Sequence, residues 1–176
     1  MRPTRPKPSG RALDRGRGFT LVELIAVVVI LGILSAVSIG AMSGLAGTRA
    51  RAAANQLARD LGYLRRHAMG TGKSCWANVS VASSRYWFQM DTSTPGYASA
   101  AALADPVSGN ALDVTLNQDP YAGVTIASTT AAAFGFDYLG RPMDTSGGAL
   151  STSVVVALSG GKSVTVHAGT GLAQAN

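Results

Sequence analysis

The chain has 176 residues and a net charge of +6 at neutral pH, with 14% charged and 6% aromatic residues. A chain of this length forms one modest domain plus an extension, and so few aromatic side chains argue against a large enzyme core. The basic character is concentrated in residues 1–18, which hold six of the 15 Lys and Arg residues and one acid, Asp14. The rest of the chain is nearly neutral, so its charge alone does not indicate a nucleic-acid-binding protein.

An uninterrupted apolar segment follows the basic leader. Residues 24–47 contain no charged side chain, and about 20 such residues are enough for a helix to cross a bilayer. The apolar part of an ordinary secretory signal is shorter, about 7–15 residues. Because cations ahead of a span stay in the cytoplasm, we predict a single membrane-spanning helix over residues 19–47, with the N-terminus cytoplasmic.

Glu23 lies at the start of this segment and needs a partner, because a carboxylate within the hydrocarbon costs about 2.5–3.5 kcal/mol. Thr20 precedes it by three residues, which is the spacing of a capping box at a helix N-terminus. A charged group from another chain would also neutralise Glu23. The residues alone leave both interpretations open.

The run from Gly18 to Glu23, GFTLVE, resembles the class III signal of type IV prepilins and pseudopilins. In that family a prepilin peptidase cuts after the glycine and methylates the new N-terminal residue. The resemblance therefore implies a cleaved leader over residues 1–18 and an N-methylated Phe19. Glu23 would then pair with the N-terminal amine of a neighbouring subunit, which is largely protonated at neutral pH. The implied location is the bacterial inner membrane with a periplasmic head, and afterwards a pilus or pseudopilus.

Small residues recur four apart within the apolar segment, at Gly32, Ala36, Gly40 and Gly44. This spacing lets helices approach closely in a membrane or a filament core. Gly40 stands where many pilins have a proline. We predict that these four residues form a helix-packing face.

Residues 48–72 are predicted to continue the helix as an amphipathic segment that enters the head. Apolar residues recur at helical spacing there: Ala50, Ala54, Leu57, Leu61, Leu64 and Ala68. Positions 48–73 contain six Lys and Arg residues and a single acid, Asp60. This basic stripe is typical of a solvated helix face near a membrane, and a nucleic-acid patch is the alternative.

Residues 73–176 are predicted to form a β-rich head. The helix should end at the glycines of residues 70–72, and Gly160 and Gly161 indicate a two-residue hairpin turn. Residues 92–110 are predicted to form a surface loop with a helical turn at 98–104. The expected strands cover residues 74–82, 85–91, 112–117, 123–127, 133–138, 153–159 and 162–167. The fold class is α+β: a long N-terminal helix, transmembrane in its first half, packed on a small antiparallel sheet or sandwich.

The C-terminal pattern resembles the GspH/FimT-type minor pilins and pseudopilins. It consists of the run FDYLGRP over residues 136–142, a valine-rich hairpin, and Thr170-Gly171-Leu172. Together with Cys75, it is most similar to the minor pilins of mannose-sensitive haemagglutinin-type systems. The resemblance implies a structural or priming subunit of a type IV pilus-like filament. Its partners would be other pilin or pseudopilin subunits, the prepilin peptidase and inner-membrane lipid.

Two other functions remain as alternatives: a GspH-like pseudopilin of type II secretion, and a FimT-like minor pilin that binds DNA during uptake. DNA is the less favoured partner because the residues from Ser74 onward are net acidic. Cys75 is the only cysteine, which excludes an intrachain disulfide and a multi-cysteine metal site, and we expect it to be buried. With no catalytic motif in the chain, we predict a protein that is not an enzyme and that needs no metal or cofactor.

Overall fold

The structure is a computed structural model that describes residues 20–92 and 96–176, with side chains except at residues 36–44. The chain divides into two compact units, Met1–Ala41 and Met42–Asn176. We call residues 74–176 the head. Gly18 and Phe19 lie outside the described residues, so the predicted cleavage site stays a prediction.

The helix α1 runs from Leu21 to Thr71. Thr20 caps its N-terminus, because its Oγ1 accepts a hydrogen bond of 3.2 Å from the backbone N–H of Glu23. At the other end, Gly72 has a φ of +67° and its N–H donates to the Ala68 carbonyl at 3.0 Å. A glycine in this left-handed conformation terminates helices without a Cβ clash, and the predicted end of the helix is confirmed.

The part of the chain that the structure describes contains no helix that meets the length and hydropathy criteria for a membrane span. The membrane-spanning segment expected over residues 19–47 therefore stays a prediction.

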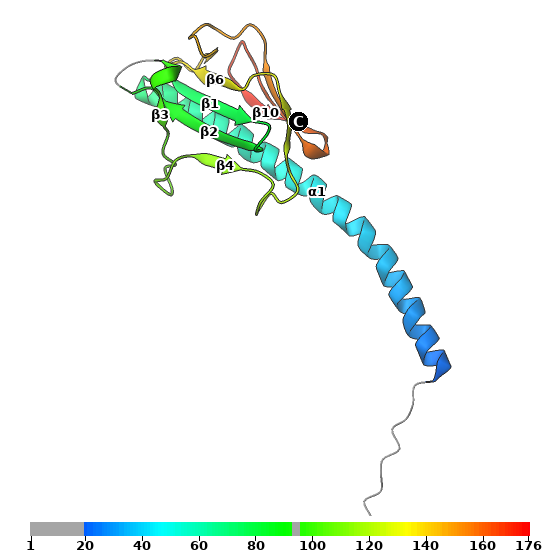
Figure 1. The fold of residues 1–176 in the computed structure, drawn as a ribbon. Coiled ribbons are helices and arrows are strands. Elements are labelled where there is room, and N and C mark those ends of the chain that lie inside the picture. Colours follow the sequence, from blue (N-terminus) through cyan, green and yellow to red (C-terminus); the bar gives the residue numbers. More distant parts are fainter. Residues whose placement is uncertain (1–19, 93–95) are drawn as a thin grey trace, which may run out of the picture. The chain divides into compact units, whose positions relative to one another are not determined.

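Two antiparallel sheets make up the head, as Figure 1 shows. The larger sheet has the order β3-β2-β1-β6-β7, with β4 also paired to β2. The smaller sheet has the order β10-β9-β8-β5. The strands of the larger sheet are β1 Cys75–Ser80, β2 Arg85–Met90, β3 Ala101–Ala102, β4 Asp113–Thr115, β6 Ala133–Phe136 and β7 Pro142–Met143. Those of the smaller sheet are β5 Ile126–Thr129, β8 Val154–Leu158, β9 Lys162–Val166 and β10 Ala173–Ala175.

All seven predicted strands are present, and three further strands, β3, β7 and β10, were missed. The helical turn expected at 98–104 is a 3-10 turn at Tyr97–Ser99, and the chain then becomes β3. The hairpin between β8 and β9 has three loop residues rather than two, because Leu158 pairs with Lys162. Both glycines of this turn have positive φ, 76° and 69°, as the sequence signal implies.

The core lies between the C-terminal part of α1 and the sheets. Figure 1 shows β1 and β2 lying across this part of the helix. All six predicted apolar stripe residues of α1 are buried, and Ala53 joins them. The sheets contribute large side chains to the same core: Tyr86, Phe88, Phe134, Phe136, Val156 and Val164. The predicted α+β architecture, a helix packed on antiparallel sheets, is confirmed.

Candidate functional site

The first turn of α1 presents Glu23 to the surroundings. Glu23 is the only acid in this turn, where negative charge interacts favourably with the helix dipole. Its backbone N–H donates to Thr20. The return bond of a complete capping box, from the Thr20 N–H to the Glu23 carboxylate, is absent among the hydrogen bonds of the described residues. The carboxylate is therefore available to a group from another molecule.

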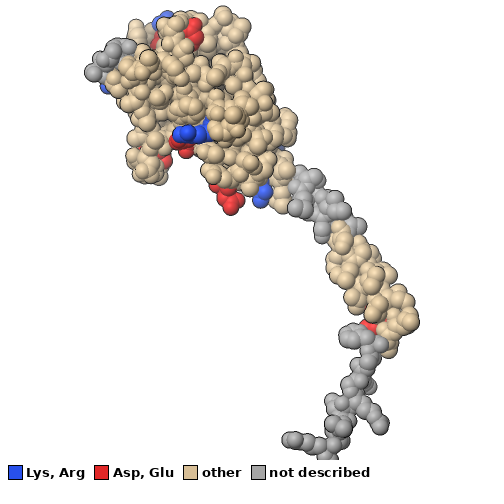
Figure 2. Space-filling model, in the orientation of Figure 1, with Lys and Arg blue, Asp and Glu red and all other residues tan. Residues whose placement is uncertain are grey.

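The helix beyond Glu23 has a continuous apolar surface. Its large hydrophobic side chains between residues 21 and 34 are 47–76% exposed in the chain by itself. In Figure 2 this stretch is tan, with red atoms only at its end. An exposed apolar surface of this extent indicates contact with lipid or with other protein.

Of the four predicted packing residues, Gly32 is the one whose surroundings are described. A Cβ built on it would meet nothing within 4 Å, so another helix could approach closely there. Ala36, Gly40 and Gly44 belong to α1, but the surroundings of these residues lie outside what the structure describes. The helix-packing role of all four stays a prediction.

The turn FDYLGRP, residues 136–142, has a structural role in the head. The Asp137 carboxylate accepts hydrogen bonds from the backbone N–H groups of Leu139 at 2.9 Å and Arg141 at 2.8 Å. It also pairs with the Arg141 guanidinium at 2.9 Å. Burial raises the pKa of Asp137, but these backbone and guanidinium contacts outweigh it and hold the pKa below its ordinary value. The aspartate is therefore ionised and fastens the turn.

Arg65 of α1 connects two distant turns, and sequence reasoning missed this role. Its Nε donates to the carbonyl of Gly140 at 2.9 Å. Gly171, from the second turn, packs on the same carbonyl: a Cβ at position 171 would lie 2.8 Å from the Gly140 oxygen. Both glycines have positive φ, so both turns require glycine. The two C-terminal motifs are therefore brought together by a helix residue that no spacing rule singles out.

Cys75 is buried, as predicted, and carries a free thiol. Burial, and secondarily the charge of Asp91, raise its pKa to about 12. Because the thiolate is the reactive form of cysteine, this thiol is unsuited to a catalytic or redox role. It serves as a small core residue at the start of β1.

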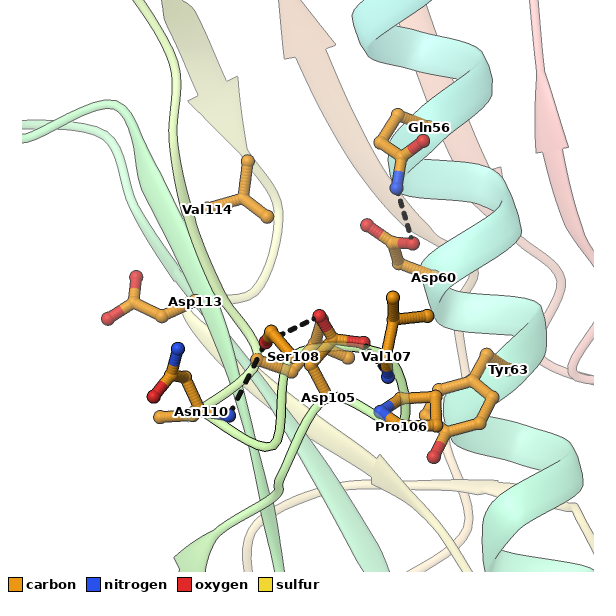
Figure 3. A pocket seen from close by; sticks show the side chains of 12 residues that line it. Gln56, Asp60, Tyr63, Asp105, Pro106, Val107, Ser108, Asn110, Asp113 and Val114 are labelled. Atoms are coloured by element: carbon orange, nitrogen blue, oxygen red, sulfur yellow. Dashed lines mark hydrogen bonds between the residues drawn. The ribbon is translucent and has the colours of Figure 1, made fainter.

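A buried polar cluster, also not predicted, joins α1 to β2. Asp60 accepts a hydrogen bond from the Tyr86 hydroxyl at 2.8 Å and another from Gln56 at 2.8 Å. Burial raises the pKa of Asp60, against the opposing effect of these two bonds. Asp60 also lines a cavity of about 610 Å³ that Figure 3 shows from close by.

Comparisons with known proteins agree with the N-terminal motif and the fold. Residues 14–39 match the prokaryotic N-terminal methylation motif. None of the curated proteins matches the chain. Among solved structures, the fold is that of the pseudopilins. One similar structure is the minor pseudopilin EpsH from the type II secretion system of Vibrio cholerae, with 14% identity and a TM-score of 0.54.

The alignment with that EpsH structure covers 73% of this chain and 96% of EpsH. A crystal structure of the same Vibrio cholerae protein aligns with 12% identity and a TM-score of 0.53, covering 73% of this chain and 93% of that one. At such identities the likeness shows the fold, a helix packed on antiparallel sheets. The resemblance to haemagglutinin-type minor pilins stays a prediction.

Proposed function

We propose that the chain is a minor pilin or pseudopilin, a structural or priming subunit of a type IV pilus-like filament. The observation that carries the proposal is the methylation motif at residues 14–39, which includes Gly18, Phe19 and Glu23. The pseudopilin-type fold also supports it.

The chemistry at the N-terminus follows from this proposal. Prepilin peptidase hydrolyses the peptide bond between Gly18 and Phe19, and the new amine of Phe19 receives a methyl group. The helix over residues 19–47 holds the protein in the bacterial inner membrane, with the head in the periplasm, until assembly. Glu23, whose carboxylate has no partner among the described residues, then pairs with the N-terminal amine of an adjacent subunit. That pairing offsets the cost of placing each charge in an apolar surrounding.

Two machines fit a subunit of this kind. The similar solved structures belong to a type II secretion system, which favours a pseudopilus. The FDYLGRP turn favours a pilus by resemblance. A deletion strain separates the two: loss of surface filaments identifies a pilus, whereas loss of protein secretion with unchanged filaments identifies a pseudopilus.

DNA uptake is the weaker alternative. Three of the six cations in the basic stripe are engaged within the chain. Arg49 donates to the Ala122 carbonyl at 3.3 Å, Arg59 to Gln56 at 2.7 Å and Arg65 to Gly140 at 2.9 Å. Phosphate binding requires cations that are free to neutralise a backbone, so this engagement weakens the case for DNA.

The proposal is tested by N-terminal processing of the full chain. Produced in a bacterial membrane together with a prepilin peptidase, the chain should lose residues 1–18 and gain one methyl group on Phe19, as read by mass spectrometry. Gly18→Val should block cleavage because the β-branched side chain obstructs close approach of the backbone to the peptidase. Gly16→Val, two residues upstream, is the matched control and should be processed normally. An uncut wild-type chain, beside a known prepilin that is cut in the same cells, would refute the proposal.

A further inference from the structure

The two flanks of α1, where it enters the head, carry opposite charge. Gln56, Asp60 and Tyr63 line a cavity on one flank. Ala58, Gly62 and Arg65 line a groove on the other. At 3.6 residues per turn these two sets lie on opposite sides of the buried stripe that contains Leu57, Leu61 and Leu64. Each flank thus forms an edge where the helix meets the head.

The basic groove has a volume of about 310 Å³ and no acid among its lining residues, which are Ala58, Arg59, Gly62, Arg65, Arg66, Gly171, Leu172 and Ala173. The described residues form two ion pairs, Arg85 with Asp113 and Arg141 with Asp137, and neither includes an arginine of the groove. Leu172 supplies an apolar rim and is 53% exposed. Arg59 and Arg65 also donate hydrogen bonds to Gln56 and to the Gly140 carbonyl, whereas Arg66 has no such bond among the described residues. The groove therefore combines positive charge, with Arg66 as its least engaged cation, with apolar surface.

The opposite flank has the complementary character. Its cavity is lined by Asp60, Asp105 and Asp113 and by no Lys or Arg. Asp113 is paired with Arg85, and burial raises the pKa of Asp60, so Asp105 is the acid of this flank that is left to meet a cation. The loop of residues 105–110 forms its outer wall, and Figure 3 shows this loop facing Tyr63 of α1. Val107 in this loop is 93% exposed, more than any other large hydrophobic residue that the structure describes. The loop therefore presents an exposed apolar side chain, Val107, next to Asp105.

Asp105 fixes the conformation of this loop, and its carboxylate stays ionised. Its carboxylate accepts hydrogen bonds from the Val107 N–H at 3.0 Å and the Ser108 hydroxyl at 2.8 Å. The backbone bond, followed by the Ser108 bond, lowers the pKa of Asp105. A turn fixed by its own aspartate is ordered before it meets a partner, which reduces the entropy cost of binding.

We propose that the basic groove, lined by Arg59, Arg65, Arg66 and Leu172, is the docking site for the loop of residues 105–110 of a second copy of this chain. In this contact Val107 packs on the apolar rim at Leu172, and Asp105 lies toward the groove arginines. The inference rests on the proposed function, in which subunits meet side by side.

The geometry of α1 suits this side-by-side contact. The two flanks occupy overlapping heights, with helix residues 56–63 on one and 58–66 on the other. At 1.5 Å per residue the two sets differ in height by less than about one turn. A copy displaced sideways therefore brings its acidic flank to the basic flank of its neighbour. Because the contact joins two different surfaces, it repeats from copy to copy into a ring or an open filament and does not give a two-fold dimer.

The test is disulfide formation between two differently tagged full chains produced in the same membranes. One chain carries Val107→Cys and the other carries Leu172→Cys, both at exposed positions. The native Cys75 is buried and should stay silent. Under mild oxidation we expect a heterodimer that carries both tags. Val81→Cys, exposed and apolar but outside the cavity and the groove, replaces Val107→Cys as the matched control and should give only background heterodimer.

A charge variant tests the role of the arginines. Arg66→Glu in the chain that carries Leu172→Cys should lower the heterodimer yield by at least about fivefold, since it places like charges together. Lys73→Glu makes the same change of charge at an exposed residue outside the groove and should leave the yield unchanged.

Each outcome decides the inference. A heterodimer yield equal to that of the Val81→Cys control overturns it, as does a yield that Arg66→Glu leaves unchanged. Binding of the full chain to duplex DNA that depends on Arg66, without the heterodimer, would assign the groove to nucleic acid and also overturn it. Mass spectrometry of the N-termini in the same membranes separates the two proposals. Chains that are processed but not cross-linked contradict the docking site alone, whereas unprocessed chains contradict the proposed function.

Discussion

Asp60 and Asp91 are the acids among the buried residues that the structure describes, and an aromatic donor meets each of them. Tyr86 donates its hydroxyl hydrogen to Asp60, and Trp76 donates its indole N–H to Asp91 at 2.8 Å. A buried polar group without a partner is costly. Sliding α1 along the sheet would separate Asp60 from Tyr86, so this bond favours a single register of the helix on β2.

Asp60 should make the stability of the head depend on pH. Its pKa is raised in the folded state, so the folded protein binds this proton more tightly than the unfolded chain does. The stabilisation is complete below the unfolded pKa of about 3.9 and is lost as the pH rises through the folded pKa. Asp60→Asn cannot titrate and still offers an oxygen to Tyr86. We therefore expect the variant to lose less stability than the wild type between about pH 4 and pH 7.

Thermal unfolding of the full chain in detergent micelles, followed by tryptophan fluorescence, measures this difference. Trp76 and Trp87 both report on the head. Asp60→Ala is the contrasting variant, because it leaves the Tyr86 hydroxyl without its acceptor. It should lower the free energy of unfolding by about 1–3 kcal/mol both near pH 4 and near pH 7. A pH dependence identical in Asp60→Asn and wild type would contradict the account.

At the scale of the single element, α1 was the most predictable part of the chain. Its buried stripe follows helical spacing, and its ends carry the signals expected of Thr20 and Gly72. The buried stripe includes alanines because other segments of the head pack closely against the helix there, which the spacing of apolar residues did not reveal. A Cβ on Gly160, in the turn between β8 and β9, would lie 3.2 Å from the Cβ of Ala50, so the hairpin packs directly on the methyl group of Ala50.

The contribution of the stripe can be measured with two leucines of the same helix. Leu64 is fully buried and Leu45 is 56% exposed. Leu64→Ala should destabilise the head by about 2–5 kcal/mol, because it removes buried methyl groups and leaves a cavity. Leu45→Ala, the same substitution at an exposed position of α1, should change its stability by less than about 0.5 kcal/mol. Equal losses in denaturant unfolding of the two variants would contradict the observed packing.

The missed strands illustrate the limit of pattern reading at this scale. The strands β3 and β7 have two residues each and β10 has three, which is too short for alternation to appear. Pairing partners define them instead: β3 pairs with the end of β2, β7 with β6 and β10 with β9. Local preference is weak for such segments, and the neighbouring strand decides their conformation.

At the scale of the whole molecule, Cys75 reports on opening of the head. It begins β1, which lies between β2 and β6 in the larger sheet. Its side chain is inaccessible, and burial raises its pKa to about 12. A thiol reagent should therefore react only when the sheet opens.

Labelling of Cys75 should consequently be slow in the folded chain and should follow its stability. Leu64→Ala should accelerate labelling at least about tenfold, because it lowers the free energy of opening. Adding Val81→Cys supplies an exposed thiol on the same head, which should react at once and verifies the reagent. Rapid labelling of Cys75 in the wild-type chain would show that the head opens without global unfolding.

Some features of this protein follow from the sequence by itself. The basic N-terminal stretch, the apolar segment, the resemblance at Gly18, Phe19 and Glu23, the helical stripe and seven strands are all local, because each depends on residues a few positions apart. Only the tertiary structure decided which distant residues meet. It joined Arg65 to the turns at Gly140 and Gly171 and Asp60 to Tyr86, and it placed an acidic and a basic edge on opposite flanks of one helix. Such contacts arise from packing between segments far apart in the chain, and no local preference encodes them.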